Sequence, residues 1–507
     1  MHVSLISPIA ALWRRAQDEP DRIAMVAEDG PWTTARLVRK SERLAAGLLA
    51  RGVAAGDRMA LHLHNTSDTV VALLACVRIG AVAVPLNTQL TTPELSDLIA
   101  RTCPLLYLGE HDLYSRVAPM TETLLPKKSR FLAAPPGTTT SGPSWPELAN
   151  IDDCSTLDKV EPELDSPAFL LSTSGSTGIS KIVVWSHRNL AALHLSGNGR
   201  GISHDDVLPI MTPLMHASGV YHLFTALAQG AVAVLINPFE PGAVLDAVQK
   251  HRITTTFGMP YMCSALAHEQ QLRPRDVSSL RAGFVSGDTC PAEIVSEFSH
   301  VFDAPLHAFW AATEDVGSTI ADADTGPCVR IVPEATVYII DSDGHAVLPG
   351  AMGEMLVSSP TTTPGYWHGP DDYTPMPGGF FHTGDLVCER EPGLLEYLGR
   401  AKDVIVRGGA KISPTEVEEA LRSHPAVADA GVAGLPDATL GQRVGALVVY
   451  AAGRDRPSNH DLASWLSERL AAWKVPEQLH AADAIPRNAL TKIDRAVVRH
   501  ELIRLTR

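Results

Sequence analysis

Up to about residue 320, hydrophobic positions alternate between the period of a helix and that of a strand. Residues 33–50 carry leucines at helical spacing, and residues 52–65 read as a turn followed by a strand. Residues 69–87 repeat this order, with a uniformly apolar helix, then Gly80, then a strand. Because such alternation is typical of a largely parallel sheet covered by helices, the pattern predicts an α/β body.

The pattern changes near residue 330, where short strands and turns replace the long alternation. Asp343-Gly344 lies between two such strands and is typical of a hairpin turn. After residues 399–409 the chain has helices and strands of its own. We therefore predict a large, multi-lobed N-terminal α/β domain with a small β-rich lobe, residues 1–401, and a small mobile α+β C-terminal domain, residues 402–507.

One loop, residues 172–181 with the sequence STSGSTGISK, is rich in small hydroxyl side chains and ends in Lys181. The residues on either side, 168–171 and 182–185, are apolar and at strand length, so the loop is expected between two strands. A flexible Ser/Gly linker is one interpretation. The other is an anion site, made by backbone N–H groups near Gly175 and Gly178, by hydroxyls and by the Lys181 charge. The spacing does not match the GxxxxGK[ST] phosphate loop.

Composition and charge restrict the class of protein. The 507 residues are 45% hydrophobic and 20% charged, which is ordinary for a globular protein. A formal net charge of -15 argues against a nucleic-acid partner, because phosphate binding needs a basic surface. The Cys residues show no CxxC spacing and no HExxH occurs, so neither a zinc site nor a disulfide framework is expected. Without a signal-like start or an apolar run of about 18 residues, we expect a cytoplasmic protein with no membrane partner.

Three further stretches carry candidate chemistry, and each also has an ordinary explanation. HTGDL, residues 382–386, places Asp385 at a turn, where Asp commonly bonds to the backbone. Residues 399–421 gather Arg, Lys and Asp around a Gly pair, which a solvated loop also would. Residues 473–495 put Lys492 in a short polar loop. Taken one at a time, these stretches do not decide between structure and function.

Their order along the chain, together with the loop and with FWAATED at residues 309–315, resembles the adenylate-forming superfamily of acyl- and aryl-CoA synthetases, peptide-synthetase adenylation domains and luciferases. The resemblance covers residues 32–495. It implies an AMP-forming acid ligase: ATP activates a small carboxylic acid as an acyl-adenylate, pyrophosphate leaves, and the acyl group passes to a thiol or another nucleophile.

The resemblance also implies roles for individual residues. Those expected to bind ATP are Thr173, Ser174, Gly175, Ser176, Thr177, Gly178 and Lys181 at the phosphates, Gly287, Asp288 and Trp310 at the adenine, and Asp385 and Arg400 at the ribose. The catalytic residues would be Thr313 at phosphate, Glu314 as the Mg²⁺ ligand, Lys492 between the acyl carboxylate and the α-phosphate, and His216 beside the acid. Mg²⁺ suits a site made of carboxylate and phosphate oxygens.

The residues that the resemblance implies around the acid are His216, Gly219, Phe257, Gly287 and Ala311. Residues 216–219 read His-Ala-Ser-Gly, without the Asp that pairs with the ammonium group in amino-acid adenylation domains. Because an unpaired buried ammonium is costly, an α-amino acid is disfavoured. Phe257 is equally well explained as a core side chain. We expect a flat aromatic or cyclic carboxylic acid rather than a long fatty chain.

A two-step reaction is implied for the C-terminal domain. The resemblance places the hinge at Lys402, about which this domain would swing after adenylation. The swing would replace Lys492 with the loop at Gly408 and Gly409 for the transfer step. Rotation about a few boundary residues is a common way of running two half-reactions in one site.

Departures from the family pattern bear on the acceptor. Ser180 and Ile182 flank Lys181 in place of Pro and Gly, Trp310-Ala311 replaces Tyr-Gly, and Thr491 replaces the Gly before the catalytic lysine. Coenzyme A is the expected acceptor because it is common in the family, with an amine or an acyl carrier protein as alternatives. A nucleotide-binding regulator is the non-enzyme alternative. An α/β-hydrolase is disfavoured because no GxSxG motif occurs.

Overall fold

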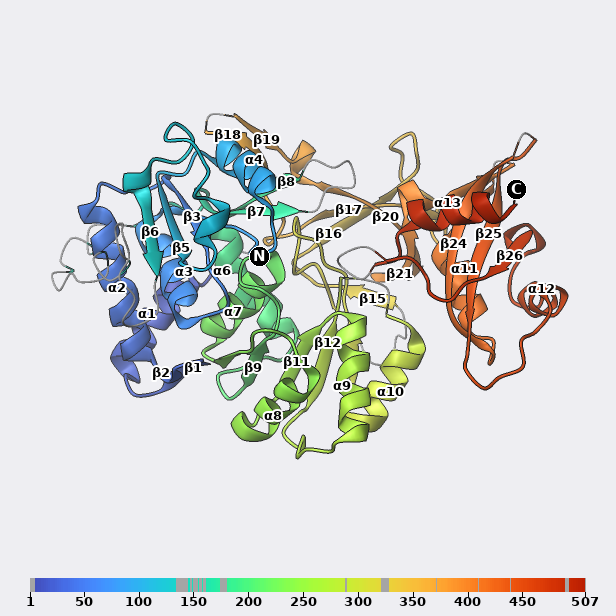
Figure 1. Ribbon diagram of the computed structural model, residues 1–507, viewed down its shortest axis with the longest axis horizontal. Coiled ribbons are helices and arrows are strands. Elements are labelled where there is room, and N and C mark those ends of the chain that lie inside the picture. Colours follow the sequence, from blue (N-terminus) through green and yellow to red (C-terminus); the bar gives the residue numbers. More distant parts are fainter. Residues whose placement is uncertain are drawn as a thin grey trace. The chain divides into compact units, whose positions relative to one another are not determined.

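The computed structural model describes residues 5–133, 145, 148, 154, 157, 161–173, 180–287, 290–320, 328–370, 372–408, 410–437, 439–487 and 492–506. The chain divides into two compact units, whose helices and strands are labelled in Figure 1. The first unit comprises Met1–Gly326, Ile331–Thr336 and Val357–Phe381, and the second comprises Pro327–Arg330, Val337–Leu356 and His382–Arg507.

The first unit contains an eight-stranded sheet with the strand order β19-β18-β8-β7-β4-β3-β5-β6. From β7 to β6 the neighbours are parallel, whereas β8 and β18 join through antiparallel pairs. Successive side chains of β8 point to opposite faces, so Val183 and Trp185 belong to one core cluster and Ile182 and Val184 to another. The strands are β3 (Arg58–His62), β4 (Val82–Pro85), β5 (Leu106–Glu110), β6 (Arg130–Ala133), β7 (Pro167–Thr173), β8 (Lys181–Ser186), β18 (Gly365–Gly369) and β19 (Asp372–Pro375).

Helices contribute apolar side chains to the clusters on both faces of this sheet. Residues of α2, α3, α6 and α7 belong to one cluster, and residues of α4 to the other. α3 is buried along nearly its whole length and ends at Gly80, whose φ of 71° suits a residue without a side chain. The helices are α1 (Pro8–Asp18), α2 (Thr34–Ala50), α3 (Ser67–Ile79), α4 (Thr92–Thr102), α6 (His187–Gly199) and α7 (Ala217–Gln229).

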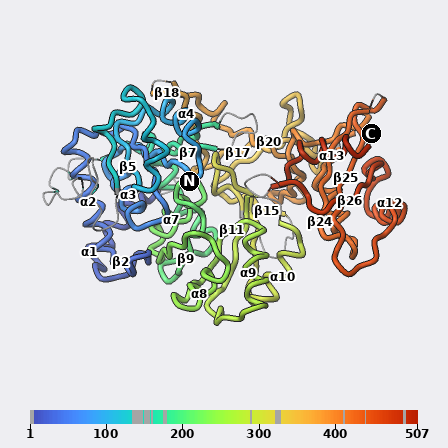
Figure 2. The backbone as a smooth tube through the Cα atoms, viewed as in Figure 1, coloured from blue at the N-terminus to red at the C-terminus, as the bar shows by residue number. Residues whose placement is uncertain are grey.

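Two smaller sheets complete the first unit, with the orders β2-β1-β10-β9 and β11-β12-β13. In the second of these all pairs are parallel. In Figure 2 the green to yellow-green part of the chain runs through β9, α8, β11, α9 and α10. The elements are β1 (Ile23–Ala27), β2 (Gly30–Thr33), β9 (Val207–Ile210), β10 (Val232–Leu235), α8 (Pro241–His251), β11 (Thr255–Gly258), α9 (Pro260–Leu272), β12 (Ala282–Val285), α10 (Ala292–Phe302), β13 (Leu306–Ala308) and β14 (Thr319–Ile320).

The second unit contains strands in the order β15-β21-β20-β17-β16. It also contains a C-terminal sheet with the order β23-β22-β25-β24, in which β26 pairs with β25 as well. Two apolar clusters fill the C-terminal part. The elements are β15 (Cys328–Ile331), β16 (Thr336–Ile340), β17 (Met352–Ser358), β20 (Phe381–Glu391), β21 (Leu394–Arg400), η6 (Ala401–Asp403), β22 (Ile405–Arg407), β23 (Ala410–Ile412), α11 (Pro414–Arg422), β24 (Val427–Asp437), β25 (Gly441–Tyr450), α12 (Asn459–Ser467), β26 (Gln478–Ala481) and α13 (Arg495–Thr506).

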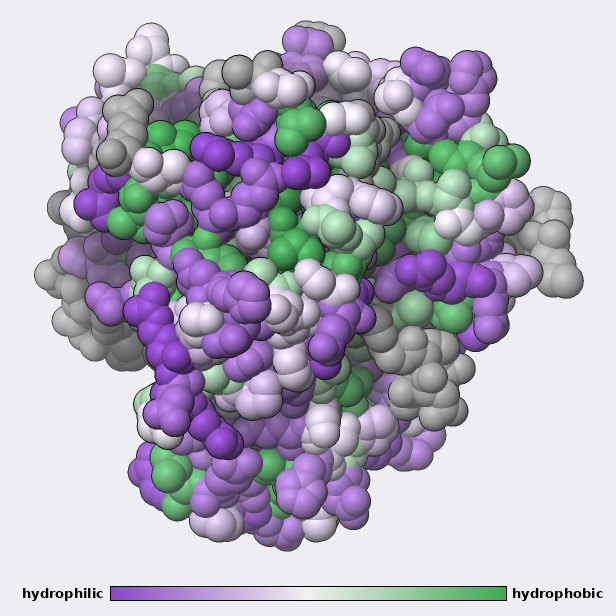
Figure 3. All heavy atoms as spheres, turned by 90° about the vertical axis from the view of Figure 1, so that its right-hand side faces the viewer, coloured by the Kyte–Doolittle hydropathy of each residue, from purple (hydrophilic) through white to green (hydrophobic). Residues whose placement is uncertain are grey.

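These elements confirm the predicted α/β class. The predicted hairpin turn is also confirmed, because the Gly344 N–H donates to Asp341 O at 3.2 Å and Ile340 pairs with Ala346. The division at residues 401 and 402 stays a prediction. Among the described helices, none combines the length and the hydrophobicity needed to cross a membrane. The face shown in Figure 3 is mainly hydrophilic, with hydrophobic residues scattered among the polar ones.

A buried ion pair connects two helices and a strand of the second unit. Glu418 of α11 has a side-chain exposure of 2% and accepts from both terminal nitrogens of Arg495 in α13, Nη2 lying 3.1 Å from Oε2. The same carboxylate accepts the Val432 N–H of β24 at 2.8 Å. Removing one member of such a pair leaves a buried charge without compensation.

We therefore expect Glu418→Ala to destabilise the second unit by about 3–5 kcal/mol. Glu501→Ala, which removes a partly exposed carboxylate paired with the exposed Arg504 on α13, should cost less than about 1 kcal/mol. Amide hydrogen exchange of the intact chain, read by mass spectrometry over α11 and β24, measures both. Equal effects of the two substitutions would contradict the assignment.

Candidate active site

Strand pairing fixes both ends of the Ser/Thr/Gly loop. β7 ends at Thr173 and β8 begins at Lys181, and these two residues are direct partners in the antiparallel ladder. The predicted strands on either side of the loop are therefore confirmed. The side chain of Arg101 also donates to the carbonyl oxygen of Ser180, at 2.8 Å. Residues 174–179 lie outside the described residues, so the roles of Ser174, Gly175, Ser176, Thr177 and Gly178 stay predictions.

Lys181 and Glu314 both contact the same aromatic side chain, that of Tyr366 on β18. Nζ of Lys181 lies 4.7 Å from the centroid of the Tyr366 ring, within the range of a cation–π interaction. The Tyr366 hydroxyl donates to Oε1 of Glu314 at 2.9 Å. Burial, and then the nearby Glu314 carboxylate, raise the pKa of Tyr366, so the phenol stays a donor at neutral pH. Sequence reasoning missed Tyr366, because an aromatic residue in a short strand reads as core.

The backbone at Thr313 and Glu314 is held from two sides. Nε1 of Trp185, on β8, donates to the Thr313 carbonyl oxygen at 2.8 Å. The Thr363 N–H donates to the Glu314 carbonyl oxygen at 2.7 Å. These bonds connect the predicted catalytic segment to β8 and to the chain that leads into β18.

Asp315, the next residue, is fully buried and accepts several hydrogen bonds. Its carboxylate accepts from the hydroxyls of Ser318 at 2.5 Å, Ser359 at 2.8 Å and Thr362 at 2.5 Å. Hydrogen bonds to a charged acceptor are stronger than those between neutral groups. Asp315 therefore fixes the loop that carries Glu314 against residues 359–363.

Trp310, the predicted adenine-binding residue, precedes this segment and is half-buried. Its N–H donates to the Thr319 hydroxyl at 2.9 Å, and its ring centroid lies 6.4 Å from that of Phe381. Beside it, the buried guanidinium of Arg200 lies 4.3 Å from the centroid of the Phe309 ring. Ala311 packs partly buried against the main core cluster. The backbone of Trp310 is thus held by Thr319, while the contact of its indole ring with adenine stays a prediction.

His216 and Gly219 lie at the start of α7 and face different surroundings. His216 is exposed and caps the helix, accepting the Ser218 N–H at 3.3 Å. Gly219 is buried, and a Cβ atom there would lie 2.2 Å from the Pro213 carbonyl oxygen. The side-chain amide of Asn65 fixes the preceding loop, since it donates to Thr212 O at 3.0 Å and accepts from Leu214 N at 2.6 Å.

Phe257 belongs to a stack of buried aromatic rings. Its centroid lies 4.4 Å from that of His222 and 4.9 Å from that of Phe284, and its exposure is 2%. Burial, and to a lesser degree the charge of Arg200, lower the pKa of His222 to about 3, so this imidazole is neutral. The packing agrees with the core interpretation of Phe257, and its contact with the acid stays a prediction.

Gly287 follows β12 with a φ of 88°, a conformation that favours glycine. The space for a Cβ atom at this position is bounded by Met259, whose Cγ would lie 3.5 Å away. Gly287 and Met259 are therefore neighbours. Asp288 lies outside the described residues.

In the second unit, Asp385 and Arg400 are paired residues of β20 and β21. Oδ1 of the buried Asp385 lies 2.8 Å from Nε of the half-exposed Arg400, which also donates to Thr383 O at 3.1 Å. The structure therefore brings the two predicted ribose-binding side chains together.

The other predicted residues of the second unit lie C-terminal to Arg400. Lys402 is exposed in η6, and Gly408 has a φ of 57° and donates its N–H to Leu440 O at 2.8 Å. Lys492 is half-buried and lies just before α13. Gly409 lies outside the described residues.

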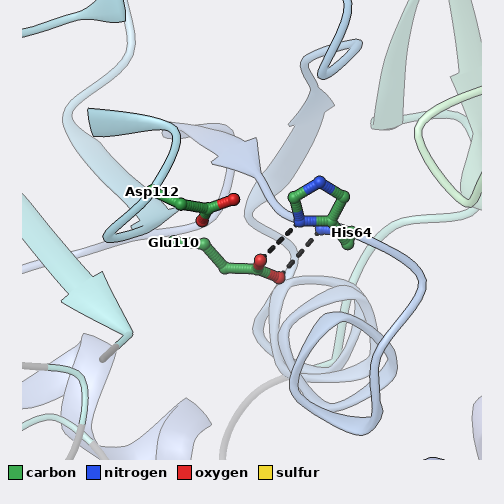
Figure 4. A group of neighbouring side chains, drawn as sticks. All are labelled: His64, Glu110 and Asp112. Carbon is green, nitrogen blue, oxygen red and sulfur yellow. Dashed lines mark hydrogen bonds and ion pairs between the residues drawn. The ribbon is translucent and has the colours of Figure 1, made fainter. Parts of the chain in front are cut away.

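A further group, His64, Glu110 and Asp112, was not predicted (Figure 4). Nδ1 of His64 lies 2.5 Å from one Glu110 oxygen, and the His64 backbone N–H donates to the other at 2.9 Å. His64 follows β3, whereas Glu110 is the last residue of the neighbouring parallel strand β5 and Asp112 follows that strand. Imidazole and carboxylate groups also bind metals, but here His64 and Glu110 contact each other directly, through the ring and the backbone N–H of His64. We therefore assign to this pair the role of joining the ends of the two strands.

Comparison with known families shows to which family the chain belongs. Residues 12–367 match the family AMP-binding enzyme, and residues 416–492 match the AMP-binding enzyme C-terminal domain. This chain belongs to the AMP-binding enzyme family. The predicted membership of the adenylate-forming superfamily and the predicted AMP-forming acid ligase are both confirmed.

Relatives of this AMP-binding enzyme resemble it over nearly its whole length. Feruloyl-CoA synthase of Amycolatopsis sp is 32% identical, with 96% of this chain and 97% of the relative covered. Indoleacetate–CoA ligase of Aromatoleum aromaticum is 31% identical, with 97% and 98% covered. Among solved structures, the amide bond synthetase McbA from Marinactinospora thermotolerans is similar with a TM-score of 0.85 at 27% identity, with 97% of this chain and 99% of that chain covered.

The family matches relate directly to the geometry of the AMP-binding enzyme. The first match ends at Trp367, so it includes Lys181, Glu314 and Tyr366. The second ends at Lys492. Asp385 and Arg400 lie between the two matches, and their pairing is known from the structure alone.

Gly219→Ala should displace the start of α7, because the added methyl would meet the backbone of Pro213. Overpacking of this kind costs about 1–3 kcal/mol. Gly199→Ala, at the end of α6 where a Cβ atom meets nothing within 4 Å, should be neutral or slightly stabilising. Thermal unfolding of the two variants measures the difference, and an equally mild effect of Gly219→Ala would show that α7 shifts freely.

Proposed function

We propose that this AMP-binding enzyme activates a flat aromatic or cyclic carboxylic acid with ATP and transfers the acyl group to coenzyme A. The observation that supports the proposal most strongly is the contact of Lys181 and Glu314 with one aromatic side chain. A cation and a carboxylate that contact the same aromatic side chain suit a nucleotide triphosphate with its metal. A flexible linker would not need this arrangement.

ATP phosphates would meet Thr173, Lys181 and the loop between them, with Thr313 as a further contact. Glu314 fits Mg²⁺, because Oε1 accepts from Tyr366 and the second carboxylate oxygen can face a hard cation. Mg²⁺, when bound, would neutralise charge on the phosphates. Gly287, Asp288 and Trp310 would bind the adenine.

Asp385 and Arg400 would bind the ribose hydroxyls. A carboxylate accepts from neighbouring O–H groups, and its bond to Arg400 fixes its orientation. Lys492 would place its ammonium between the acyl carboxylate and the α-phosphate, where attack of one anion on another needs a cation. Lys402 remains the proposed hinge, and Gly408 and Gly409 the proposed loop of the transfer step.

Two features support an aromatic or cyclic acid. Residues 216–219 offer no carboxylate for an ammonium group, which disfavours amino acids. The relatives named for feruloyl-CoA and indoleacetate are ligases of aromatic acids by their names. His216, Gly219, Phe257, Gly287 and Ala311 are the proposed surroundings of the acid.

An amine is the second candidate acceptor. The structural similarity to an amide bond synthetase supports it, as do the departures at Ser180, Ile182 and Thr491 from the family pattern. An acyl carrier protein is a third possible acceptor. All three share the same first step, so they differ only in the nucleophile that attacks the acyl-adenylate.

Lys492→Ala should abolish adenylate formation and spare acyl transfer from a supplied acyl-adenylate. Losing one electrostatic donor of this kind costs on the order of 10²–10³ in rate. Single-turnover measurements of each half-reaction test this, with Lys250→Ala at the exposed end of α8 as the matched control. Equal loss in both half-reactions would contradict the role of Lys492.

The acceptor is tested by incubating the enzyme, ATP and Mg²⁺ with aryl, cyclic and alkyl acids, adding either coenzyme A or free amines. Mass spectrometry identifies the product. The proposal predicts thioesters of aryl or cyclic acids. Amides alone would overturn coenzyme A as acceptor, and a preference for long alkyl acids would overturn the proposed acid class.

A further inference from the structure

We propose that Tyr366 is a positioning residue, which orients the Glu314 carboxylate and holds the Lys181 ammonium beside it. This inference rests on the proposed roles of Glu314 at Mg²⁺ and of Lys181 at phosphate. It assigns to one phenol the task of keeping the metal ligand and the phosphate ligand in a fixed relation.

The orientation of Glu314 depends on groups from several elements. Its carbonyl oxygen is held by Thr363 and that of Thr313 by Trp185, so its backbone position is fixed. The side chain can still rotate about its own bonds. The Tyr366 hydroxyl at 2.9 Å from Oε1 stops that rotation and directs the second oxygen away from the phenol. A charge-assisted hydrogen bond of this length is stronger than one between neutral groups.

The position of Tyr366 is itself fixed by strand pairing. Its partner across the β8–β18 ladder is Val183, so Lys181 is a diagonal neighbour on the same face of the sheet. On the other side, β19 lies so close that a Cβ atom on Gly365 would come within 2.1 Å of Thr374 O. Tyr366 therefore cannot shift along the strand without disrupting the pairing of β18 with β8 or with β19.

The phenol ring has a second function in this arrangement. Nζ of Lys181 lies 4.7 Å from the ring centroid, where the negative face of the ring attracts it. The hydroxyl meets the carboxylate, and the ring meets the ammonium. Tyr366 thus contacts both charged groups, one through its hydroxyl and the other through its ring.

The two contacts can be separated by substitution. Tyr366→Phe keeps the ring and removes the hydroxyl, so it should weaken Mg²⁺ binding about 10-fold and leave ATP binding in the absence of metal unchanged. Tyr366→Leu removes both, so it should also weaken ATP binding about 2- to 5-fold. Tyr373→Phe, on the adjacent strand β19 and 40% exposed, is the matched control and should change neither.

The experiment measures Mg²⁺ affinity of the intact chain by calorimetry with a non-hydrolysable ATP analogue, and the Mg²⁺ dependence of adenylation beside it. Glu314→Gln and the double variant Glu314→Gln/Tyr366→Phe are included. If Tyr366 acts through Glu314, the double variant loses no more Mg²⁺ affinity than Glu314→Gln alone. Additive losses would overturn the proposal.

The outcomes separate this inference from the proposed function. If Glu314→Gln leaves Mg²⁺ affinity unchanged, the proposed role of Glu314 is wrong, and that of Tyr366 falls with it. If Glu314→Gln weakens Mg²⁺ binding and Tyr366→Phe does not, only the role of Tyr366 is overturned. A Tyr366→Phe variant that merely unfolds at lower temperature, with unchanged Mg²⁺ affinity, would likewise overturn it.

Discussion

The antiparallel pairing of β8 with β7 and β18 is the contact on which the candidate site depends. It places Thr173 opposite Lys181, and it places Tyr366 diagonally from Lys181 on the same face. β8 is buried on both faces beyond Lys181, so the strand that carries the cation is also part of two core clusters. Each fully buried Val or Ile contributes about 1.5–3 kcal/mol, and this burial makes the position of Lys181 rigid.

The same strand explains one departure from the family pattern. Ile182 stands where a glycine is usual, and its side chain is 2% exposed within the core cluster that includes Val184 and Trp367. The Ile182 side chain therefore packs in this core cluster, on the opposite face of the strand from the Lys181 side chain. Ser180, the other neighbour, is held through its carbonyl oxygen by Arg101. The two departures leave the contact between Lys181 and Tyr366 intact.

Local patterns predicted the fold well where one period dominates. The apolar run before Gly80 formed α3, the apolar runs beside the loop formed β7 and β8, and Asp343-Gly344 formed a turn. The order of short motifs predicted the family. The sequence could not show which side chains meet, because contacts such as that of Tyr366 with Glu314 join residues far apart in the chain.

Pairings that depend on strand register were equally hidden. Asp385 and Arg400 were each predicted from the resemblance, but their ion pair follows from the register of β20 with β21. His64 follows β3 and Glu110 is the last residue of the parallel strand β5, and nothing local in the sequence relates them. For Phe257, both interpretations were available, and only the ring stack with His222 and Phe284 shows how it packs.

The proposed function begins with the formation of an acyl-adenylate from ATP and the acid. Exchange of labelled pyrophosphate into ATP by the intact chain, with Mg²⁺ and a panel of aryl and cyclic acids, tests it most directly. We expect exchange that requires an acid and needs neither coenzyme A nor an amine, because adenylation precedes the attack of the acceptor. Binding of ATP without acid-dependent exchange would rule out adenylation and would favour a nucleotide-binding regulator.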